Sequence, residues 1–266
     1  MARILILSSW VAHGHVGLSA AAPALQALGH EVTQLPTTVL SNHPGWPHVA
    51  GAPVPVGQIE GMIGALDANG WLMAQDAFLV GYMPSPDHVA LAVGLARRMR
   101  KAGVRVVVDP VLGDLPGGLY VPQEVAETLR DALVPLADLL TPNLFELGWL
   151  TGAPLETLAE ARAAASGLLN PDAEVLVTSA PVGPRRTGVL RVSGEAAQVF
   201  AVALREGVPH GVGDVFSALV AGGLSPGLAL GQLSALIEAS LDAPHLRIAS
   251  AAPDWTRAAP LTPTEI

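Results

Sequence analysis

The segment "HGVGDVFSAL" places Asp214 directly behind two glycines and at the start of an apolar run with helical spacing. Glycines let backbone N–H groups point into a cavity, and a helix N-terminus favours an anion. We therefore expect the amides of this turn to hold a phosphate while the Asp214 carboxylate takes a proton from an alcohol. An ordinary aspartate in the first turn of a helix is the alternative interpretation.

Two further segments combine carboxylates with an asparagine. "DPVLGD" supplies Asp109 and Asp114, and "TPNLFE" supplies Asn143 and Glu146, three residues apart and thus on one face of a nascent helix. Carboxylates near a phosphate site suit Mg²⁺ held largely through water. The alternative for the second segment is a capping box, with Asn143 as N-cap and Glu146 at the third helical position. The two roles can coexist.

Three histidines, His13, His15 and His43, lie in "SSWVAHGHVG" and "SNHPG". No helical H-E-x-x-H or comparable ligand set accompanies them, so the sequence disfavours a zinc site. A histidine in a loop is more often a surface hydrogen-bonding group.

The same segments contain groups suited to a small flat substrate. Ser9, at the end of the first predicted strand, is a candidate to bind a polar substrate. Trp10, Trp46 and Tyr82 are candidates to wall a flat ring, with packing in the core as the alternative for each.

Lys101 is the only lysine, and it lies in "RRMRKAG" at the expected exposed end of a helix. The chain therefore has no G-x-x-x-x-G-K-[ST] phosphate loop. If it handles nucleotides, then backbone amides, a metal ion and arginines must neutralise the phosphates.

The bulk composition excludes several classes. The chain has 266 residues, 50% hydrophobic and 14% charged, which is typical of a globular protein. Its net charge of −9 argues against nucleic acid or an anionic membrane as partner, and the lack of cysteine excludes disulfides and thiolate chemistry. The sequence contains no membrane span, and "MARILILSSW" looks like a first strand instead of a signal peptide. We expect a soluble cytoplasmic protein.

Strand-like runs alternate with longer helical patterns. The predicted strands are 3–9, 30–37, 76–83, 104–110, 137–143 and 173–179, followed by two antiparallel strands within 187–202 around Ser193-Gly194. The predicted helices are 17–29, 86–103, 122–136, 143–152, 155–169 and, approximately, 213–223 and 226–241. The pattern predicts a three-layer α/β/α fold with a doubly wound, mainly parallel sheet and a short antiparallel edge.

No repeat or break in composition divides the chain, so we expect residues 1–266 to form one domain. The Pro/Gly-rich segment 36–57 is predicted to be a long irregular loop that covers the substrate. The Pro-rich tail 252–266 is expected to pack loosely. Polar or Gly-rich groups follow six consecutive strands, and ligands bind at the carboxyl ends of strands in such sheets.

Together these segments resemble the pyridoxal kinases, a branch of the ribokinase-like superfamily of small-molecule kinases. The resemblance covers nearly the whole chain, through "SSWVAHGHVGLSAA", "LSNHPG", "GYM", "DPVLGD", "YVP", "LADLLTPNLFEL" and "HGVGDVFSAL" in the family's order. The G-x-G-D motif is shared across the superfamily, whereas "GHVG" and "SNH" point to the pyridoxal branch.

The resemblance implies transfer of the γ-phosphoryl group of Mg-ATP to the 5′-hydroxyl of pyridoxal. Asp214 would be the base, and the amides of Gly211, Val212 and Gly213 the anion hole. Asp109 and Glu146 would organise Mg²⁺ through water. The nucleotide site would be lined by Asp109, Asp114, Tyr120, Thr141, Asn143, Glu146, Thr178, Ser179, Val199, Phe200, Ala201 and Val202. The pyridine ring would be surrounded by Ser9, Val16, His43, Pro44, Gly45 and Tyr82. The family is typically homodimeric, so we expect a dimer, and an activating monovalent cation such as K⁺ stays open.

The chain departs from the family pattern near the ring. Pro44 stands where a substrate-contacting threonine is common, and Trp10 where a histidine is usual. His13 and Leu18 replace the usual tyrosine and asparagine, and Val212 stands where many relatives have threonine. A kinase for another hydroxymethyl heterocycle, such as hydroxymethylpyrimidine, is therefore the second hypothesis. A non-catalytic protein that binds pyridoxal phosphate would be expected to lack Asp214 or Asp109, and both are present, so the sequence disfavours that function. A dehydrogenase is also disfavoured, because no G-x-G-x-x-G motif follows the first predicted strand.

Overall fold

The structure is a computed structural model that describes residues 1–168 and 173–266. Within these residues, ten strands form one sheet with the order β12-β11-β10-β9-β8-β5-β4-β1-β2-β3, and β6 and β7 form a separate pair. The strands are β1 (Arg3–Val11), β2 (Glu31–Leu40), β3 (Gly51–Pro53), β4 (Ala77–Val80), β5 (Arg105–Val108), β6 (Gly113–Asp114), β7 (Gly118–Leu119), β8 (Leu139–Leu140), β9 (Glu174–Val177), β10 (Arg186–Ser193), β11 (Ala196–Ala203) and β12 (Thr264–Glu265).

The centre of the sheet is parallel and both of its edges are antiparallel. Strands β2, β1, β4, β5, β8 and β9 run parallel to one another. At one edge β10, β11 and β12 pair antiparallel, and at the other β3 pairs antiparallel with β2. This confirms the predicted doubly wound, mainly parallel sheet, including the hairpin within 187–202.

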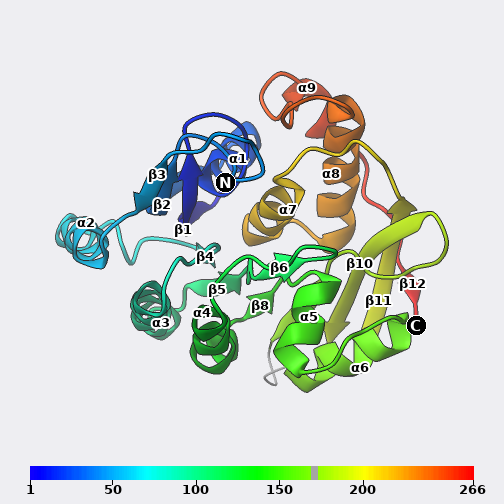
Figure 1. Ribbon diagram of the computed structural model, residues 1–266, viewed down its shortest axis with the longest axis horizontal. Coiled ribbons are helices and arrows are strands. Elements are labelled where there is room, and N and C mark those ends of the chain that lie inside the picture. Colours follow the sequence, from blue (N-terminus) through cyan, green and yellow to red (C-terminus); the bar gives the residue numbers. More distant parts are fainter. Residues whose placement is uncertain (169–172) are drawn as a thin grey trace.

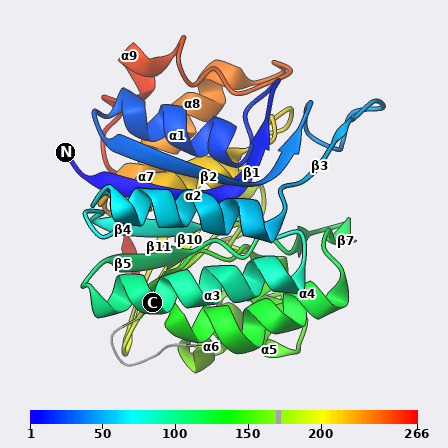
Figure 2. The ribbon, with the colours of Figure 1, turned by 90° about the vertical axis from the view of Figure 1, so that its left-hand side faces the viewer.

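Helices cover both faces of the sheet. They are α1 (Leu18–Ala27), α2 (Val56–Ala68), α3 (Pro86–Lys101), α4 (Gln123–Thr128), α5 (Leu144–Thr151), α6 (Leu158–Leu168), α7 (Val212–Ala221), α8 (Pro226–Ser240) and α9 (Ala252–Trp255). Helices α1, α7 and α8 pack on one face and α2, α3 and α6 on the other, which gives the three layers seen in Figures 1 and 2. In the described part of the chain, no helix has the length and apolar composition that crossing a membrane requires.

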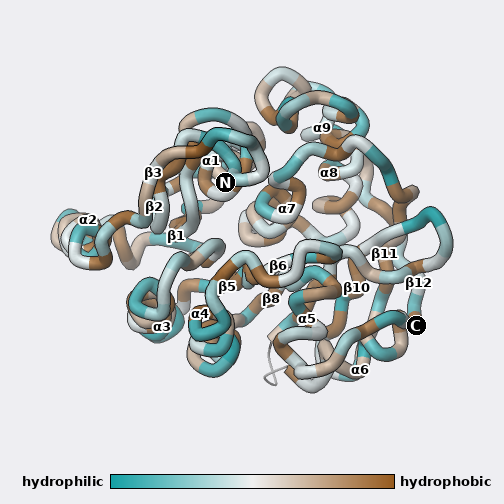
Figure 3. Tube along the Cα trace, in the orientation of Figure 1, coloured by the Kyte–Doolittle hydropathy of each residue, from teal (hydrophilic) through white to brown (hydrophobic). Residues whose placement is uncertain are grey.

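Each face of the sheet has its own hydrophobic core. Successive side chains of a strand point to opposite faces, so Ile4 and Ile6 of β1 join the core beneath α1 and α7, while Leu5 and Leu7 join the core beneath α2 and α3. All four are almost completely buried. The apolar run of the first strand thus reflects burial on both faces, and Figure 3 shows hydrophobic residues along the central strands.

The prediction for segment 36–57 is wrong in most of its length. Strand β2 continues to Leu40, β3 returns beside it, and α2 begins at Val56, so only 41–50 and 54–55 lie outside regular structure. The strand tolerates Pro36 because the register between β1 and β2 shifts beside it. Helix α2 was missed because three of its residues are glycines, which disfavour helices.

Helix 122–136 is only partly regular. α4 ends at Thr128 and is followed by a π-helical turn, Leu129–Leu133, and a 3₁₀ turn, Val134–Leu136. Pro135 accounts for the change, since it has no N–H group and disfavours the α conformation at the residue before it. The predicted helix 155–169 corresponds to α6, and its last residue lies outside the described residues.

The expectation of a loosely packed tail is also wrong. Trp255 on α9 is fully buried, and its indole N–H donates to the carbonyl oxygen of Ile248 at 2.8 Å. Farther along, β12 adds to the sheet beside β11. A single aromatic side chain therefore anchors a segment whose prolines suggested an irregular tail.

Replacing Trp255 with alanine should lower the free energy of unfolding by about 3–5 kcal/mol, because it empties a large buried site and leaves a carbonyl unpaired. Trp71 is 58% exposed and offers a matched control, for which Trp71→Ala should change stability by less than about 0.5 kcal/mol. Urea unfolding followed by circular dichroism measures both. Equal losses for the two variants would contradict the role of Trp255 as an anchor.

Candidate active site

The turn before α7 has a backbone that only glycine can adopt. Gly211 has φ +98° and is the N-cap of α7, and a Cβ at this position would collide with the carbonyl oxygen of His15. No side chain caps the helix here. The N–H groups at the start of α7 have no partner within the helix and can face an anion.

Asp214 lies in the first turn of α7 and is tied to the turn that follows β1. The N–H group of Gly17 donates to its carboxylate, as does its own N–H group. Burial nevertheless raises the pKa of Asp214 to about 6, against the opposing effect of these hydrogen bonds. Gly17 has φ +53°, and a Cβ there would collide with Ser9. Two glycine turns thus bring β1 and α7 into backbone contact.

Asp109 follows β5 and lies in the same small cavity as Asp214. The cavity is also lined by Ile6, Ser8, Gly17, Ala21, Leu79, Gly81 and Ser217. The Ser217 hydroxyl donates to Oδ2 of Asp109 at 2.8 Å. Burial raises the pKa of Asp109 well above its usual range, and the negative charges of Glu146 and Asp214 raise it further. The two aspartates predicted to carry the chemistry are therefore neighbours.

Glu146 and Asn143 form the capping box that the sequence predicts at the start of α5. Oε2 of Glu146 accepts from the N–H group of Asn143 at 2.8 Å, and Oε1 accepts from that of Leu112 at 2.8 Å. The Asn143 amide group donates to the carbonyl oxygen of Gly113 at 2.8 Å. Burial raises the pKa of Glu146 to about 7, although these backbone hydrogen bonds lower it. Glu146 thus caps α5 and also holds the loop after Asp109.

Asp114 and Tyr120 lie at the β6–β7 hairpin, which continues from that loop. The N–H group of Tyr120 donates to the carbonyl oxygen of Leu112 at 2.7 Å. Tyr120 is 52% exposed, and partial burial together with a hydrogen bond to Asp114 raises the pKa of its hydroxyl. In Figure 2, β7 and the β2–β3 hairpin project at the same end of the molecule. The two hairpins thus lie on the side where the parallel strands end.

The structure joins Thr141 and Thr178 to this group. The Thr141 hydroxyl lies 2.8 Å from that of Ser217, and the N–H group of Thr178 donates to the carbonyl oxygen of Pro142 at 2.8 Å. Thr178 thereby forms a bridge beside Asn143, while the next residue, Ser179, is exposed with φ +54°.

Val199, Phe200, Ala201 and Val202 lie on β11, near the antiparallel edge of the sheet. Phe200 packs against Gly227 of α8 within the core, so its side chain serves packing. Any contact that this segment makes with a nucleotide would have to come from its backbone or its half-buried side chains.

One residue predicted to surround a ring, Tyr82, contacts the cavity-lining Ser8. Tyr82 follows β4, and its backbone is held twice: its N–H group donates to Ser8 Oγ at 3.2 Å and its carbonyl oxygen accepts from Thr37 Oγ1 at 2.8 Å. Burial raises the pKa of the Tyr82 hydroxyl. Ser9 lies within β1, which continues to Val11, so the prediction that Ser9 ends the first strand is wrong. Val16 lies in the turn after β1, next to the glycine that contacts Asp214.

His43, Pro44 and Gly45 lie in the 41–50 loop, which reaches the turn before α7. The rings of His43 and His210 are stacked with centroids 4.1 Å apart, and Nδ1 of His43 accepts from the N–H group of Gly45 at 3.1 Å. Burial and the neighbouring His210 lower the pKa of His43, although Asp114 opposes this. Pro44 and Gly45 are exposed. The loop therefore rests on the residue that precedes Gly211.

A second ring cluster lies beside the first. His245 is 4.7 Å from His13 and 6.0 Å from Trp46, measured between ring centroids. His210 and His245 were missed at the level of sequence because no motif marks them. Ser217 was also missed, although its position three residues after Asp214 places both on one face of α7.

Hard oxygen donors fit a magnesium ion at this site. The negative charges of Glu146 and Asp214 both raise the pKa of Asp109, and a divalent cation would stabilise these carboxyls in the charged form. Among the described residues, no three His, Cys, Asp or Glu side chains converge closely enough to hold a metal by themselves. Water and phosphate oxygens would therefore complete the coordination shell.

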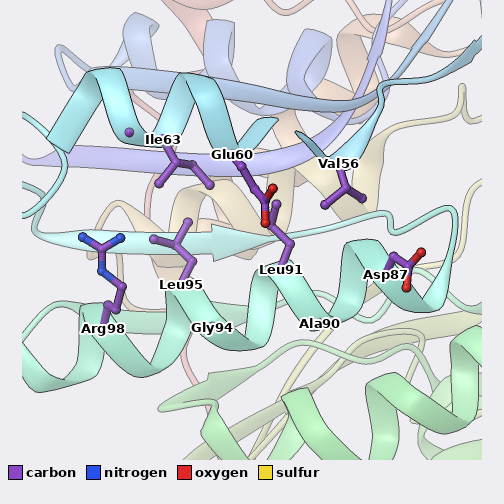
Figure 4. Close-up of a pocket in the computed structure, with 10 residues that line it drawn as sticks. Val56, Glu60, Ile63, Asp87, Ala90, Leu91, Gly94, Leu95 and Arg98 are labelled. Carbon is purple, nitrogen blue, oxygen red and sulfur yellow. The ribbon is translucent and has the colours of Figure 1, made fainter. Parts of the chain in front are cut away.

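A larger groove lies elsewhere, between α2 and α3 (Figure 4). Its walls include Val56, Ile63 and Leu91, with Glu60 and Arg98 at the rim. None of the residues predicted to carry chemistry lines it.

Comparisons with known proteins agree with this geometry. Residues 68–239 match the family model described as phosphomethylpyrimidine kinase. The chain is 39% identical to the pyridoxine/pyridoxal/pyridoxamine kinase of Bordetella avium over 85% of this chain and 79% of that one. It is 38% identical to a pyridoxal kinase of Deinococcus radiodurans over 83% of this chain and 78% of that one. The solved pyridoxal kinase of Leishmania donovani in complex with ADP and pyridoxamine has a TM-score of 0.90 at 29% identity, covering 99% of this chain and 100% of that one. The fold is thus the ribokinase-like fold of these enzymes, and the chain belongs to the pyridoxal kinase family.

Proposed function

We propose that this protein transfers the γ-phosphoryl group of ATP to the 5′-hydroxyl of pyridoxal, giving pyridoxal 5′-phosphate. One observation carries the proposal: Asp214, which directly follows the glycine turn at the start of α7, lines the same cavity as Asp109. Two solved structures of one relative support it, since the Leishmania donovani pyridoxal kinase was captured with ADP alone and with ADP and pyridoxamine. A non-catalytic binding protein would not need these groups together.

Asp214 acts as the base in this proposal. Its pKa of about 6 leaves it ionised at neutral pH yet basic enough to accept a proton from the alcohol as the new P–O bond forms. The hydrogen bond from the N–H group of Gly17 fixes the carboxylate. The released proton then resides on Asp214 until exchange with solvent.

The amides of Gly211, Val212 and Gly213 form the anion hole. Phosphoryl transfer depends mainly on positioning and on stabilising charge at the phosphoryl oxygens. Backbone N–H groups at a helix N-terminus supply both without a lysine, which agrees with the single, distant Lys101.

Asp109 and Glu146 would hold Mg²⁺ through water, with Asp114 at the rim. When bound, the ion would neutralise charge on the transferring phosphates. The chain's own contribution is to fix these carboxylates, Asp109 through Ser217 and Glu146 through backbone amides of the neighbouring loop.

The remaining site residues are proposed contacts. The nucleotide would lie along Tyr120, Thr141, Asn143, Thr178, Ser179 and the β11 segment Val199–Val202. The pyridine ring would lie against Ser9, Val16, His43, Pro44, Gly45 and Tyr82. Residues 1–266 would act as one kinase domain, and two such chains would form a homodimer. The enzyme would serve the salvage of vitamin B6. The 41–50 loop would cover the bound substrate.

A kinase for hydroxymethylpyrimidine is the second candidate. Two observations favour it: the matching family model carries the description phosphomethylpyrimidine kinase, and Pro44 lacks the hydroxyl expected beside a pyridoxal ring. Both candidates share the phosphate chemistry, so only the acceptor separates them.

The acceptor is tested by measuring ADP release from Mg-ATP with pyridoxal, pyridoxine, pyridoxamine and hydroxymethylpyrimidine, each offered alone. We expect turnover with pyridoxal. Turnover with the pyrimidine alone would replace the first candidate with the second, and turnover with none of the four would reject both.

Pro44→Thr should lower the KM for pyridoxal by about fivefold, the effect of one added hydrogen bond, with kcat nearly unchanged. Pro47 lies in the same exposed loop and provides the control, since Pro47→Thr adds a hydroxyl outside the proposed ring site. An equal change in both variants would show that the loop backbone, and not the hydroxyl, determines affinity.

Asp214→Asn should lower kcat by at least about 100-fold while ADP binding, measured by calorimetry, stays within about twofold. The substitution keeps the size of the side chain and removes its basicity. Asp254→Asn, on the exposed surface of α9, is the matched control and should retain full activity. Persistent turnover of the Asp214 variant would remove Asp214 from its role as base.

The pH dependence has a definite sign. A raised pKa means that Asp214 is protonated, and inactive as a base, below about pH 6. The value of kcat should therefore be level above pH 7 and fall by about tenfold per unit well below pH 6. A stopped assay with saturating Mg-ATP and vitamer measures this. A kcat that is independent of pH from 5 to 8 would contradict the assignment.

A further inference from the structure

Ser217 lies on α7, three residues after Asp214, and is 2% exposed. Its hydroxyl lies 2.8 Å from Oδ2 of Asp109 and 2.8 Å from the hydroxyl of Thr141. It therefore joins the end of β5, the end of β8 and the helix that carries the proposed base. It also lines the cavity shared by the two aspartates.

The direction of these hydrogen bonds follows from counting protons. The Ser217 hydroxyl has one proton and donates it to Oδ2 of Asp109, which in the ionised form that would bind a cation can only accept. Thr141 must then donate to Ser217. Its other available acceptor, the carbonyl oxygen of Val108, lies at the longer distance of 3.5 Å. The result is a directed chain from Thr141 through Ser217 to Oδ2 of Asp109.

This chain of hydrogen bonds constrains the side chain of Asp109, to which one further donor is known. The carboxylate is buried beside two like charges, and its remaining hydrogen bond comes from the N–H group of Val111. Val111 has φ +45°, a conformation that a β-branched residue rarely adopts, so the loop itself is held by its surroundings. Donors from two elements, α7 and the loop, thus hold the carboxylate.

We propose that Ser217 is a positioning residue that fixes the Asp109 carboxylate for the magnesium-bound nucleotide, an inference that rests on the proposed function. Ser217 acts through Asp109 and does not itself contact substrate. Its removal is expected to raise the Mg²⁺ concentration that nucleotide binding requires and to leave binding of the vitamer unchanged.

Ser234 on α8 provides the contrast. In the described part of the chain its buried hydroxyl oxygen has no hydrogen-bond partner, so its removal takes away no directed contact. Ser217→Ala and Ser234→Ala each remove one hydroxyl oxygen from a helix. Only the Ser217 hydroxyl holds a carboxylate. Ser217→Thr keeps the hydroxyl and tests rescue.

The experiment measures ADP binding by calorimetry over a series of Mg²⁺ concentrations, without vitamer, in the full-length chain and the three variants. Ser217→Ala should raise the Mg²⁺ concentration for half-maximal binding by about tenfold, the effect of a hydrogen bond to a charged group. Ser217→Thr and Ser234→Ala should stay within about twofold of the unmodified chain. The KM for pyridoxal should stay unchanged in Ser217→Ala. Thermal unfolding of each variant is measured in parallel to set the temperature at which all are folded.

A Ser217→Ala variant with unaltered Mg²⁺ dependence would overturn the assignment of Ser217 alone. So would a Ser234→Ala variant that shifts as far, because the effect would then be one of general stability. Nucleotide binding that is independent of Mg²⁺ in the unmodified chain would overturn the proposed magnesium site and, with it, the role of Ser217.

Discussion

The close approach of two glycine turns is the constraint on which the site depends. The turn after β1 and the turn before α7 lie in backbone contact, because Gly211 leaves no side chain against the carbonyl oxygen of His15. Gly17 in turn donates its N–H group to Asp214. A side chain at Gly211 would collide with the turn after β1, and a side chain at Gly17 would collide with Ser9 of β1. Either collision would separate the proposed anion hole from the proposed ring site. The packing of α1 against α7, seen in Figure 1, maintains this contact.

The second feature on which the site depends is a group of buried carboxyls. Asp109, Glu146 and Asp214 all have raised pKa values, and burial is the first cause for each. Because burial makes the ionised forms of these three carboxyls unfavourable when no ligand is bound, the arrangement favours binding of a cation together with a polyphosphate. Backbone N–H groups of the loop after β5 hold the Glu146 carboxylate. The Asp109 carboxylate is instead held by the hydroxyl of Ser217 on α7, which in turn contacts the hydroxyl of Thr141 at the end of β8. The site is thus prepared electrostatically before its ligands arrive.

Much of this could be predicted from the sequence. The mainly parallel sheet with its antiparallel hairpin, the capping box at Asn143 and the meeting of Asp109 with Asp214 follow from periodicity and from the rule that strand ends converge. What the sequence did not show depends on tertiary contacts. The β2–β3 hairpin needs a register shift beside Pro36, and burial of Trp255 secures a Pro-rich tail. The stack of His43 on His210 joins residues far apart in the chain, which no local pattern reveals.

The central claim concerns one cavity, and the most direct test is a crystal structure with ADP, Mg²⁺ and pyridoxal bound together. The account predicts the 5′-hydroxyl oxygen within hydrogen-bond distance of the Asp214 carboxylate. It also predicts that the β-phosphate faces the amides of Gly211–Gly213 and that the ion lies on the Asp109 side. A vitamer bound with its hydroxyl away from Asp214, or a nucleotide whose phosphates avoid the start of α7, would contradict it.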